Sequence, residues 1–154
     1  MKKPKVGIIM GSKSDMPVME KVALLLADFG IAFDITIASA HRAPKKVRSF
    51  IAKAEKNYDL IIAGAGMAAH LPGVIASYTT LPVIGVPISS KDLSGFDSLY
   101  SIVQMPPGVP VATVAIGGVK NAAILAAEIL SLKYSTLKAK LKKLKSEMAK
   151  GKKV

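Results

Sequence analysis

Val6-Gly7-Ile8-Ile9-Met10-Gly11-Ser12-Lys13-Ser14-Asp15 is an apolar run that passes directly into a short loop of small and polar residues. The loop is followed by apolar residues with helical spacing, at Met19, Val22, Ala23, Leu26 and Ala27. Gly30 ends this pattern, as glycine commonly does just beyond the last turn of a helix. The segment is therefore typical of a buried strand, a loop and an amphipathic helix, which together begin a βα unit.

The same alternation continues along the chain. We expect further strands near residues 32–38, 60–63, 83–86 and 112–116, and further helices near 44–56, 68–78, 97–104 and 121–132. Apolar strands that alternate with helices predict a parallel sheet covered on both faces. The predicted fold is a three-layer α/β/α sandwich with a flavodoxin-like, doubly wound parallel sheet of strand order 2-1-3-4-5. Since no repeat, low-complexity stretch or linker interrupts residues 1–154, we expect a single domain.

The composition excludes several classes of protein. Of the 154 residues 51% are hydrophobic, but no apolar segment approaches the ~20 residues that a membrane-spanning helix needs. Residues 1–5 are mostly basic, and the apolar run after them is too short for a signal peptide. The chain has no cysteine, which excludes disulfides, thiolate nucleophiles and cysteine-ligated metals. These features predict a cytoplasmic protein that does not associate with membranes.

The formal net charge of +12 is concentrated near the C-terminus, where residues 133–154 contain nine Lys and one Glu. Residues 135–150 are predicted to form a basic amphipathic C-terminal helix with the apolar stripe Leu137, Leu141, Leu144 and Met148. Such helices commonly pack on their own protein or on a neighbouring subunit, and the apolar composition favours the neighbouring subunit. Tyr134 is the only aromatic residue in this segment, so we expect no stacking on single-stranded nucleic acid.

Both histidines of the chain lie directly after predicted strands. His41 belongs to the cluster at residues 39–44, and His70 belongs to the cluster at residues 64–73. The carboxyl ends of parallel strands meet at one edge of a sheet, so these clusters should converge there with residues 11–15. Histidine titrates near neutral pH, which makes this edge a candidate site for acid/base chemistry. One histidine alone would most often be structural, but three converging clusters favour a functional site.

Each cluster allows a binding role and a structural role. Ser12, Ser14 and Asp15 open a helix, where they can hold an anion or a ribose or simply cap the helix. Arg42 can bind a phosphate through two parallel hydrogen bonds, or it can form a surface ion pair. Residues 66–69 are small apart from Met67. Small residues permit either close approach of a ligand to the backbone or close packing of a helix on a strand.

Four motifs, in this order, resemble the PurE family of purine biosynthesis over about residues 5–150. They are Gly11-Ser12-Lys13-Ser14-Asp15, Ser39-Ala40-His41-Arg42, Ala68-Ala69-His70-Leu71-Pro72-Gly73 and Ser98-Leu99-Tyr100-Ser101-Ile102-Val103-Gln104-Met105-Pro106. The resemblance implies a three-layer α/β sandwich that assembles as a homo-octamer. It also implies a mutase that converts N5-carboxyaminoimidazole ribonucleotide to 4-carboxy-5-aminoimidazole ribonucleotide without a metal or an organic cofactor.

A second class of this family carboxylates aminoimidazole ribonucleotide directly with CO2. That class carries an Arg-Ser-Asn stretch where this chain has Met67-Ala68-Ala69-His70, so the mutase class fits better, although mutases often have Gly in place of Met67. Two alternatives from other classes are a flavin- or nucleotide-binding module on the same fold and an RNA-binding protein that uses the basic tail. The chain lacks the Gly-x-Gly-x-x-Gly motif, which weighs against the module.

The resemblance also implies roles for individual residues. His41 resembles the acid/base residue of the family, and Arg42 resembles its phosphate ligand. His70 is the second residue assigned to catalysis, in the wall that holds the migrating CO2. The predicted substrate contacts are Ser12, Ser14, Asp15, Ser39, Arg42, Gly66, Met67, Ala68, Ala69 and Leu71. The expected partner is a small ribonucleotide, and we expect no metal, nucleic acid or membrane to bind.

Overall fold

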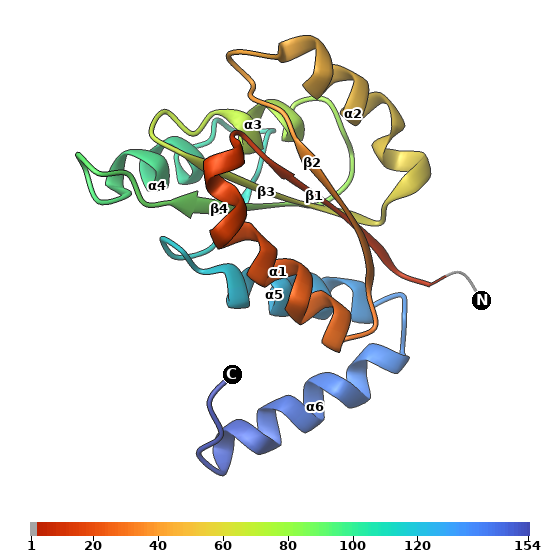
Figure 1. Ribbon diagram of the computed structural model, residues 1–154. Helices are drawn as coiled ribbons and strands as arrows, with labels where there is room; N and C mark the ends of the chain where they lie inside the picture. Colours follow the sequence, from red (N-terminus) through yellow and green to blue (C-terminus); the bar gives the residue numbers. More distant parts are fainter. Residues whose placement is uncertain (1–2) are drawn as a thin grey trace.

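The computed structural model describes residues 3–154; Met1 and Lys2, the start of the basic N-terminal stretch, lie outside the described residues. Its five strands are β1 (Lys5–Met10), β2 (Ala32–Ile37), β3 (Leu60–Gly66), β4 (Val83–Ile88) and β5 (Ala112–Thr113). They form one sheet of order β2-β1-β3-β4-β5, and every neighbouring pair is parallel (Figure 1). The strand order predicted from the sequence is therefore confirmed.

Helices cover both faces of this sheet (Figure 1). They are α1 (Met16–Asp28), α2 (Pro44–Asn57), α3 (Leu71–Ala76), α4 (Phe96–Val103), α5 (Val119–Ser131) and α6 (Thr136–Ala149). Side chains of α1, α5 and α6 share one apolar core with the sheet, and those of α2, α3 and α4 share the other. The predicted three-layer α/β/α sandwich with a C-terminal helix is confirmed.

The side chains of the central strands alternate between the two cores. Ile8 and Ile62, which are paired across β1 and β3, face α1 and α5, whereas Ile9 and Ile61 face α2 and α3. All four side chains are fully buried, which explains why these strands are apolar without interruption. At the sheet edge, β2 is more open, and Ile35 keeps 38% of its surface exposed.

Glycines on the central strands let the helices approach the sheet closely. A Cβ atom on Gly64 of β3 would lie 2.4 Å from the Sδ atom of Met19 on α1. On the other face, a Cβ atom on Gly7 of β1 would lie 2.8 Å from the ring of Tyr58, which stacks on Phe50 of α2. Both positions therefore need glycine for packing, because a side chain there would overlap a buried neighbour.

The first half of the basic C-terminal helix packs on its own chain. Leu137 and Leu141 are buried against the α1 and α5 side of the core. The Nζ atom of Lys140 donates hydrogen bonds to the carbonyl oxygens of Asp28 and Phe29, 3.3 and 2.9 Å away, at the C-terminal end of α1. The expectation that this helix packs on a neighbour was therefore wrong for its first half, because its stripe finds apolar partners within the same chain.

Two elements are shorter than the sequence suggests. The helix expected near residues 68–78 is limited to α3, because the backbone around Met67 makes tight turns that are not helical. The strand expected at residues 112–116 is limited to Ala112–Thr113, and the chain then turns at Gly117, whose φ is 66°. Within residues 3–154, no helix is long and apolar enough to cross a membrane.

Asp59 ties together the amino-terminal edge of the sheet, opposite the histidines. Its carboxylate accepts hydrogen bonds from the Lys5 N–H at 3.1 Å, from Lys133 Nζ at 2.9 Å and from the Tyr134 hydroxyl at 2.9 Å. Burial alone would raise the pKa of Asp59, but these hydrogen bonds and the charge of Lys133 together lower it. The ionised form is therefore the one that the fold stabilises.

We predict that Asp59→Asn lowers the free energy of unfolding by about 1–3 kcal/mol at pH 7, because charge-assisted hydrogen bonds are lost in a nearly buried position. The pKa of Asp59 is lower in the folded chain, so this stabilisation is complete above the unfolded value of 3.8 and disappears as pH falls through the folded value. Urea denaturation at pH 7 and pH 3 measures both effects. The control Glu147→Gln removes a half-exposed carboxylate that pairs with an exposed lysine, and it should change stability little. An equal loss at both pH values for Asp59→Asn would contradict the prediction.

Candidate functional site

A cavity of about 630 Å³ lies at the carboxyl ends of β1, β3 and β4, where the chain from β2 also passes. The residues that line it are Gly11, Ser12, Ser14, Asp15, Ser39, Ala40, His41, Arg42, Ala65, Gly66, Met67, Ala68, His70, Leu71, Ile88, Ser89, Ser90, Lys91 and Asp92. The three predicted clusters thus converge on one cavity. The strand order reverses between β1 and β3, and ligands of doubly wound folds bind at such a point.

The loop after β1 is held by its own hydrogen bonds. The Ser12 N–H donates to Asp15 Oδ2 at 3.0 Å, and Ser12 Oγ accepts from the N–H and the hydroxyl of Ser14. This capping box begins a 3₁₀ turn at Lys13–Asp15, so the structural role considered for these residues is present. It leaves one Asp15 oxygen without a hydrogen bond to a described residue, so a binding role remains open.

Asp15 is a buried carboxylate, with only 9% of its surface exposed. Burial raises its pKa, and the Ser12 N–H and the charge of Arg42 offset only part of this effect. A carboxyl group whose pKa is raised by burial inside a cavity is typical of a functional position.

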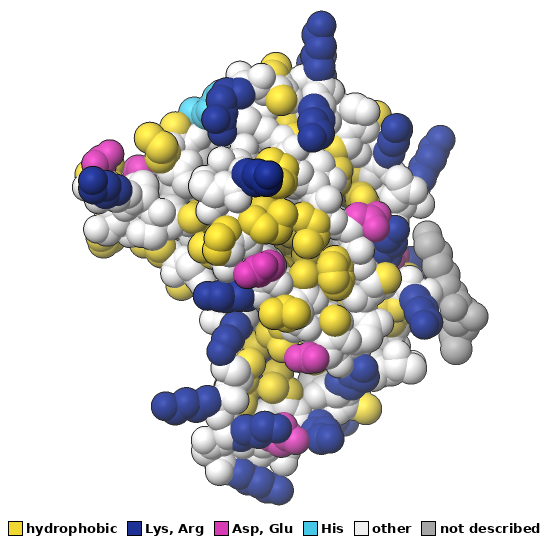
Figure 2. Space-filling model, viewed as in Figure 1, with side chains coloured by type: hydrophobic (Ala, Val, Ile, Leu, Met, Phe, Trp, Pro, Cys, Tyr) yellow, Lys and Arg dark blue, Asp and Glu magenta, His cyan; other side chains and the backbone are white. Residues whose placement is uncertain are grey.

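The two histidines contact each other across the cavity. His41 Nε2 and His70 Nδ1 lie 2.8 Å apart, and the two rings meet edge to face with their centroids 4.9 Å apart. One of these nitrogens must therefore donate and the other accept. Figure 2 shows a histidine side chain at the surface beside basic side chains. His41 Nδ1 and His70 Nε2 make no hydrogen bond with the described residues and remain available to a ligand.

Arg42 is exposed, and its guanidinium forms no salt bridge with a carboxylate of residues 3–154. The surface ion pair considered for it is therefore absent from the described part of the chain. Its backbone N–H donates to Ser39 Oγ at 3.2 Å, which orders the turn that carries His41. The five donors of the guanidinium are free to bind an anionic ligand.

Residues 66–68 and Leu71 form the wall of the cavity beside His70. A Cβ atom on Gly66 would lie 3.3 Å from the backbone oxygen of Ile88, so close packing explains this glycine. Ala68 is exposed to the cavity and Leu71 is buried at its edge. Ala69, in contrast, is buried and does not line the cavity, and its N–H bonds to the Met67 carbonyl. Its expected contact with a ligand finds no support in the structure.

Comparison with known proteins places the chain in a family. A family model described as AIR carboxylase matches residues 5–151. The chain belongs to the AIR carboxylase family.

Several curated relatives of this family member are highly similar to it. The N5-carboxyaminoimidazole ribonucleotide mutase of Pyrococcus abyssi is 60% identical over 146 residues, which cover 94% of this chain and 84% of the relative. The mutase of Thermotoga maritima is 58% identical over 146 residues, which cover 94% of this chain and 85% of the relative. The phosphoribosylaminoimidazole carboxylase of Saccharomyces cerevisiae is 54% identical over 142 residues, covering 92% of this chain and 25% of that longer protein.

Solved structures agree with this assignment. The crystal structure of Treponema denticola PurE has a TM-score of 0.88 with this AIR carboxylase family member, at 35% identity and with 97% and 94% of the two chains covered. The type II dehydroquinase of Propionibacterium acnes has a TM-score of 0.54 at 11% identity, covering 84% of this chain and 99% of the dehydroquinase. At that identity only the fold is shared.

The part of the cavity that follows β4 was not predicted from the sequence. Ser89, Ser90, Lys91 and Asp92 line it, although none of them was expected in the site. Their position gave a usable signal, because β4 is parallel to β3 and its carboxyl end must therefore open onto the same edge. Across residues 3–154, no group of three or more His, Asp or Glu side chains is arranged to hold a metal ion.

Met67 adopts a left-handed backbone conformation with φ of 55°, while 63% of its surface is exposed. This conformation costs a non-glycine residue roughly 1–2 kcal/mol. We therefore predict that Met67→Gly raises the free energy of unfolding by about 1 kcal/mol, measured by urea denaturation. Met67→Ala keeps the Cβ atom and should show no gain. A glycine variant that is no more stable than the alanine variant would contradict the prediction, because it would show that glycine relieves no backbone strain at this position.

Proposed function

We propose that this chain is an N5-carboxyaminoimidazole ribonucleotide mutase, which converts its substrate to 4-carboxy-5-aminoimidazole ribonucleotide in purine biosynthesis. The observation that carries this proposal is the joint position of the His41–His70 pair, Asp15 and the unpaired Arg42 in one cavity. A ribonucleotide presents a phosphate, a ribose and a base, and the cavity offers a cation, hydrogen-bonding groups and an acid/base pair for them. Relatives at 60% and 58% identity that carry this name support the same activity.

Binding is assigned to the polar end of the cavity. Arg42 holds the phosphate, which a guanidinium can bind through two parallel hydrogen bonds, and the hydroxyls of Ser12, Ser14 and Ser39 add donors. The ionised carboxylate of Asp15 accepts hydrogen bonds from ribose hydroxyls. The backbone of residues 66–68 and the buried Leu71 face the imidazole ring, and the small Gly66 and Ala68 allow close contact there.

The proposed reaction moves a carboxylate from N5 to C4 of the substrate. The bond between N5 and the carboxyl carbon breaks, CO2 leaves, and N5 keeps the electron pair and takes a proton from His41. C4 then attacks the carbon of the trapped CO2, and His41 removes the proton from C4, which restores both the ring and the acid. The enclosing wall beside His70 has a purpose in this sequence, since escape of CO2 would leave uncarboxylated nucleotide.

The hydrogen bond between the histidines suits such a proton transfer. Because His41 Nε2 is engaged by His70 Nδ1, the nitrogen of His41 that can face the substrate is Nδ1. A proton gained or lost at His41 can be shared with His70 through the 2.8 Å hydrogen bond. The same contact holds both rings in place before substrate binds.

Turnover with different nucleotides tests the activity itself. We expect the protein to consume N5-carboxyaminoimidazole ribonucleotide in the absence of bicarbonate, because the substrate already carries the carboxylate. The competing activity, direct carboxylation, would require aminoimidazole ribonucleotide and a rate that rises with CO2 or bicarbonate. The similarity to the yeast carboxylase makes that second activity the one to exclude. Turnover of uncarboxylated nucleotide alone would overturn the proposal.

The two histidines should differ in their contribution. We predict that His41→Asn lowers turnover at least ~10²-fold, the usual scale for a positioned acid/base group, while substrate binding survives. His70→Asn should retain more activity and release more uncarboxylated ribonucleotide. Rates in both directions, with free aminoimidazole ribonucleotide quantified, measure the difference. Near-parental turnover of His41→Asn would contradict the assigned role, and equal losses in both variants would mean that the pair acts as one unit.

A homo-octamer remains part of this proposal. On α4, Phe96, Tyr100 and Val103 follow a helical spacing, and 56%, 60% and 48% of their respective surfaces are exposed. An apolar stripe of this kind on the surface of a single chain supports a contact between subunits.

The cytoplasmic location also stays a prediction, as does the absence of a metal or cofactor. A flavin- or nucleotide-binding module is less favoured, because a binding module does not require a histidine pair at the ligand cavity.

A further inference from the structure

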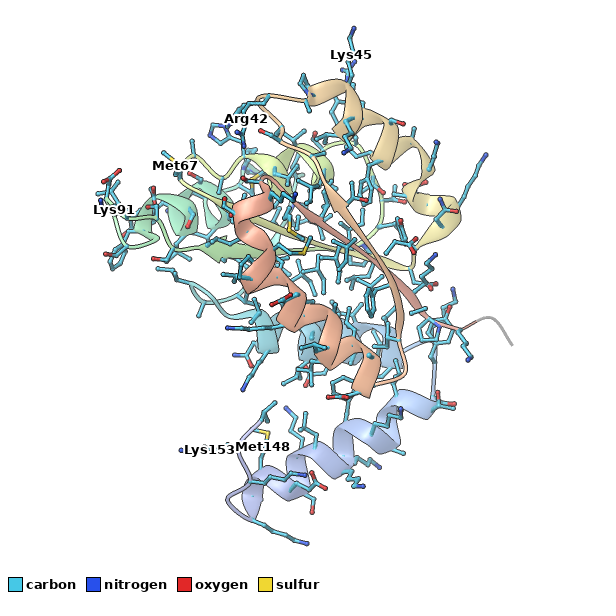
Figure 3. All side chains as sticks on the ribbon, viewed as in Figure 1. Arg42, Lys45, Met67, Lys91, Met148 and Lys153 are labelled. Atoms are coloured by element: carbon cyan, nitrogen blue, oxygen red, sulfur yellow. The ribbon has the colours of Figure 1, made fainter. Side chains whose placement is uncertain are left out.

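Lys91 is the second cation of the cavity, and the sequence motifs and the roles proposed above give it no function. It lies in the loop between β4 and α4 and lines the cavity together with Arg42 and Met67. Figure 3 shows these three residues along one edge of the molecule, with Met67 between the two cations. Lys91 is exposed, and its ammonium makes no hydrogen bond or salt bridge with residues 3–154.

The loop that carries Lys91 is fixed at both ends. Before Lys91, the Ser90 hydroxyl donates to the carboxylate of Asp97 at 2.9 Å. The buried Ser98 hydroxyl lies 2.9 Å from both the Ile88 carbonyl and the Gly95 carbonyl, which joins the end of β4 to the start of α4. These contacts hold the backbone of residue 91 at the rim of the cavity, whereas its long side chain stays free to reach a ligand.

The two cations are placed for a ligand with two separated anionic groups. Arg42 follows β2 and Lys91 follows β4, and the strand order puts β1 and β3 between them. Three strand spacings of ~4.8 Å separate their strands, about 14 Å in all. Asp15 and Asp92 are the two acidic side chains of the lining, so a doubly anionic ligand needs both cations to offset repulsion.

We propose that Lys91 binds the carboxylate that the reaction moves, at the end of the cavity opposite the phosphate site. This inference rests on the proposed mutase function, in which every turnover begins and ends with a carboxylated nucleotide. Lys91 thereby makes the cavity selective for carboxylated over uncarboxylated ribonucleotide. Its ammonium is a mobile point charge, so it can follow a carboxylate from N5 to C4 without the fixed geometry of a guanidinium.

The test compares two nucleotides that differ only in the carboxylate. Dissociation constants of 4-carboxy-5-aminoimidazole ribonucleotide and of aminoimidazole ribonucleotide are measured by calorimetry for the parent protein, Lys91→Gln and Lys91→Arg. Lys91→Gln loses one charge-assisted contact, so its dissociation constant for the carboxylated nucleotide should rise about ten-fold. Binding of the uncarboxylated nucleotide should stay within about two-fold of the parent, and Lys91→Arg should restore most of the loss because it keeps the charge.

Lys45→Gln is the matched control, because Lys45 is an exposed lysine of α2 that does not line the cavity and points away from it (Figure 3). It removes the same charge and should leave both dissociation constants unchanged. If Lys91→Gln weakened the binding of both nucleotides equally, the inference would be overturned. Such a result would indicate that Lys91 acts on the phosphate that both nucleotides share, or through the overall electrostatic potential of the cavity. No effect on either nucleotide would also overturn it and would leave the proposed function standing. A parent protein that binds neither nucleotide would overturn the proposed function itself.

Discussion

The reversal of strand order between β1 and β3 is the constraint on which the site depends. These strands are paired side by side, but α1 packs on one face of the sheet and α3 on the other. The loops that follow β1 and β3 therefore lead to opposite faces of the sheet, and the cavity lies in the space between these loops. The Gly11 N–H donates to the Gly64 carbonyl at 3.2 Å, which keeps the two strand ends together at the point of divergence. The contact of Met19 with Gly64 sets α1 close beneath this point, so packing and site geometry are coupled.

Two carboxylates, the nearly buried Asp59 and the buried Asp15, show how differently the two edges of the sheet are built. Asp59, at the amino-terminal edge, accepts three hydrogen bonds, and its pKa falls. Asp15, in the cavity, accepts one, and burial raises its pKa. At neutral pH the ionised Asp59 stabilises the fold, whereas burial of the Asp15 charge has a cost that the few partners of Asp15 offset only in part. Asp15 has few hydrogen-bond partners, and the nearby Met67 has a strained backbone. Both features are expected at a ligand-binding site, where the ligand provides the missing hydrogen bonds.

The histidine pair joins segments that are distant in the sequence. His41 follows β2 and His70 follows β3, and the chain of β1 lies between those strands in the sheet. A direct nitrogen–nitrogen hydrogen bond across this distance requires both loops to fold over the end of β1. Each ring then fixes the orientation of the other, and no described carboxylate is needed to orient them. The arrangement leaves one nitrogen of each ring free, which is the minimum that a shared proton relay needs.

The strand order, the two-sided cover of the sheet and the convergence of the clusters at residues 11–15, 39–44 and 64–73 were all predictable from the sequence. Hydrophobic periodicity is a local property, and the handedness of βαβ connections leaves few topologies. The sequence did not reveal the 2.8 Å contact of the histidines, the entry of Lys91 into the cavity or the docking of the C-terminal helix on its own chain. Those depend on loop conformations and on which apolar surfaces meet in three dimensions. The hydrophobic pattern along the chain predicts whether a side chain is buried or exposed, but only the packed structure determines which residue it contacts.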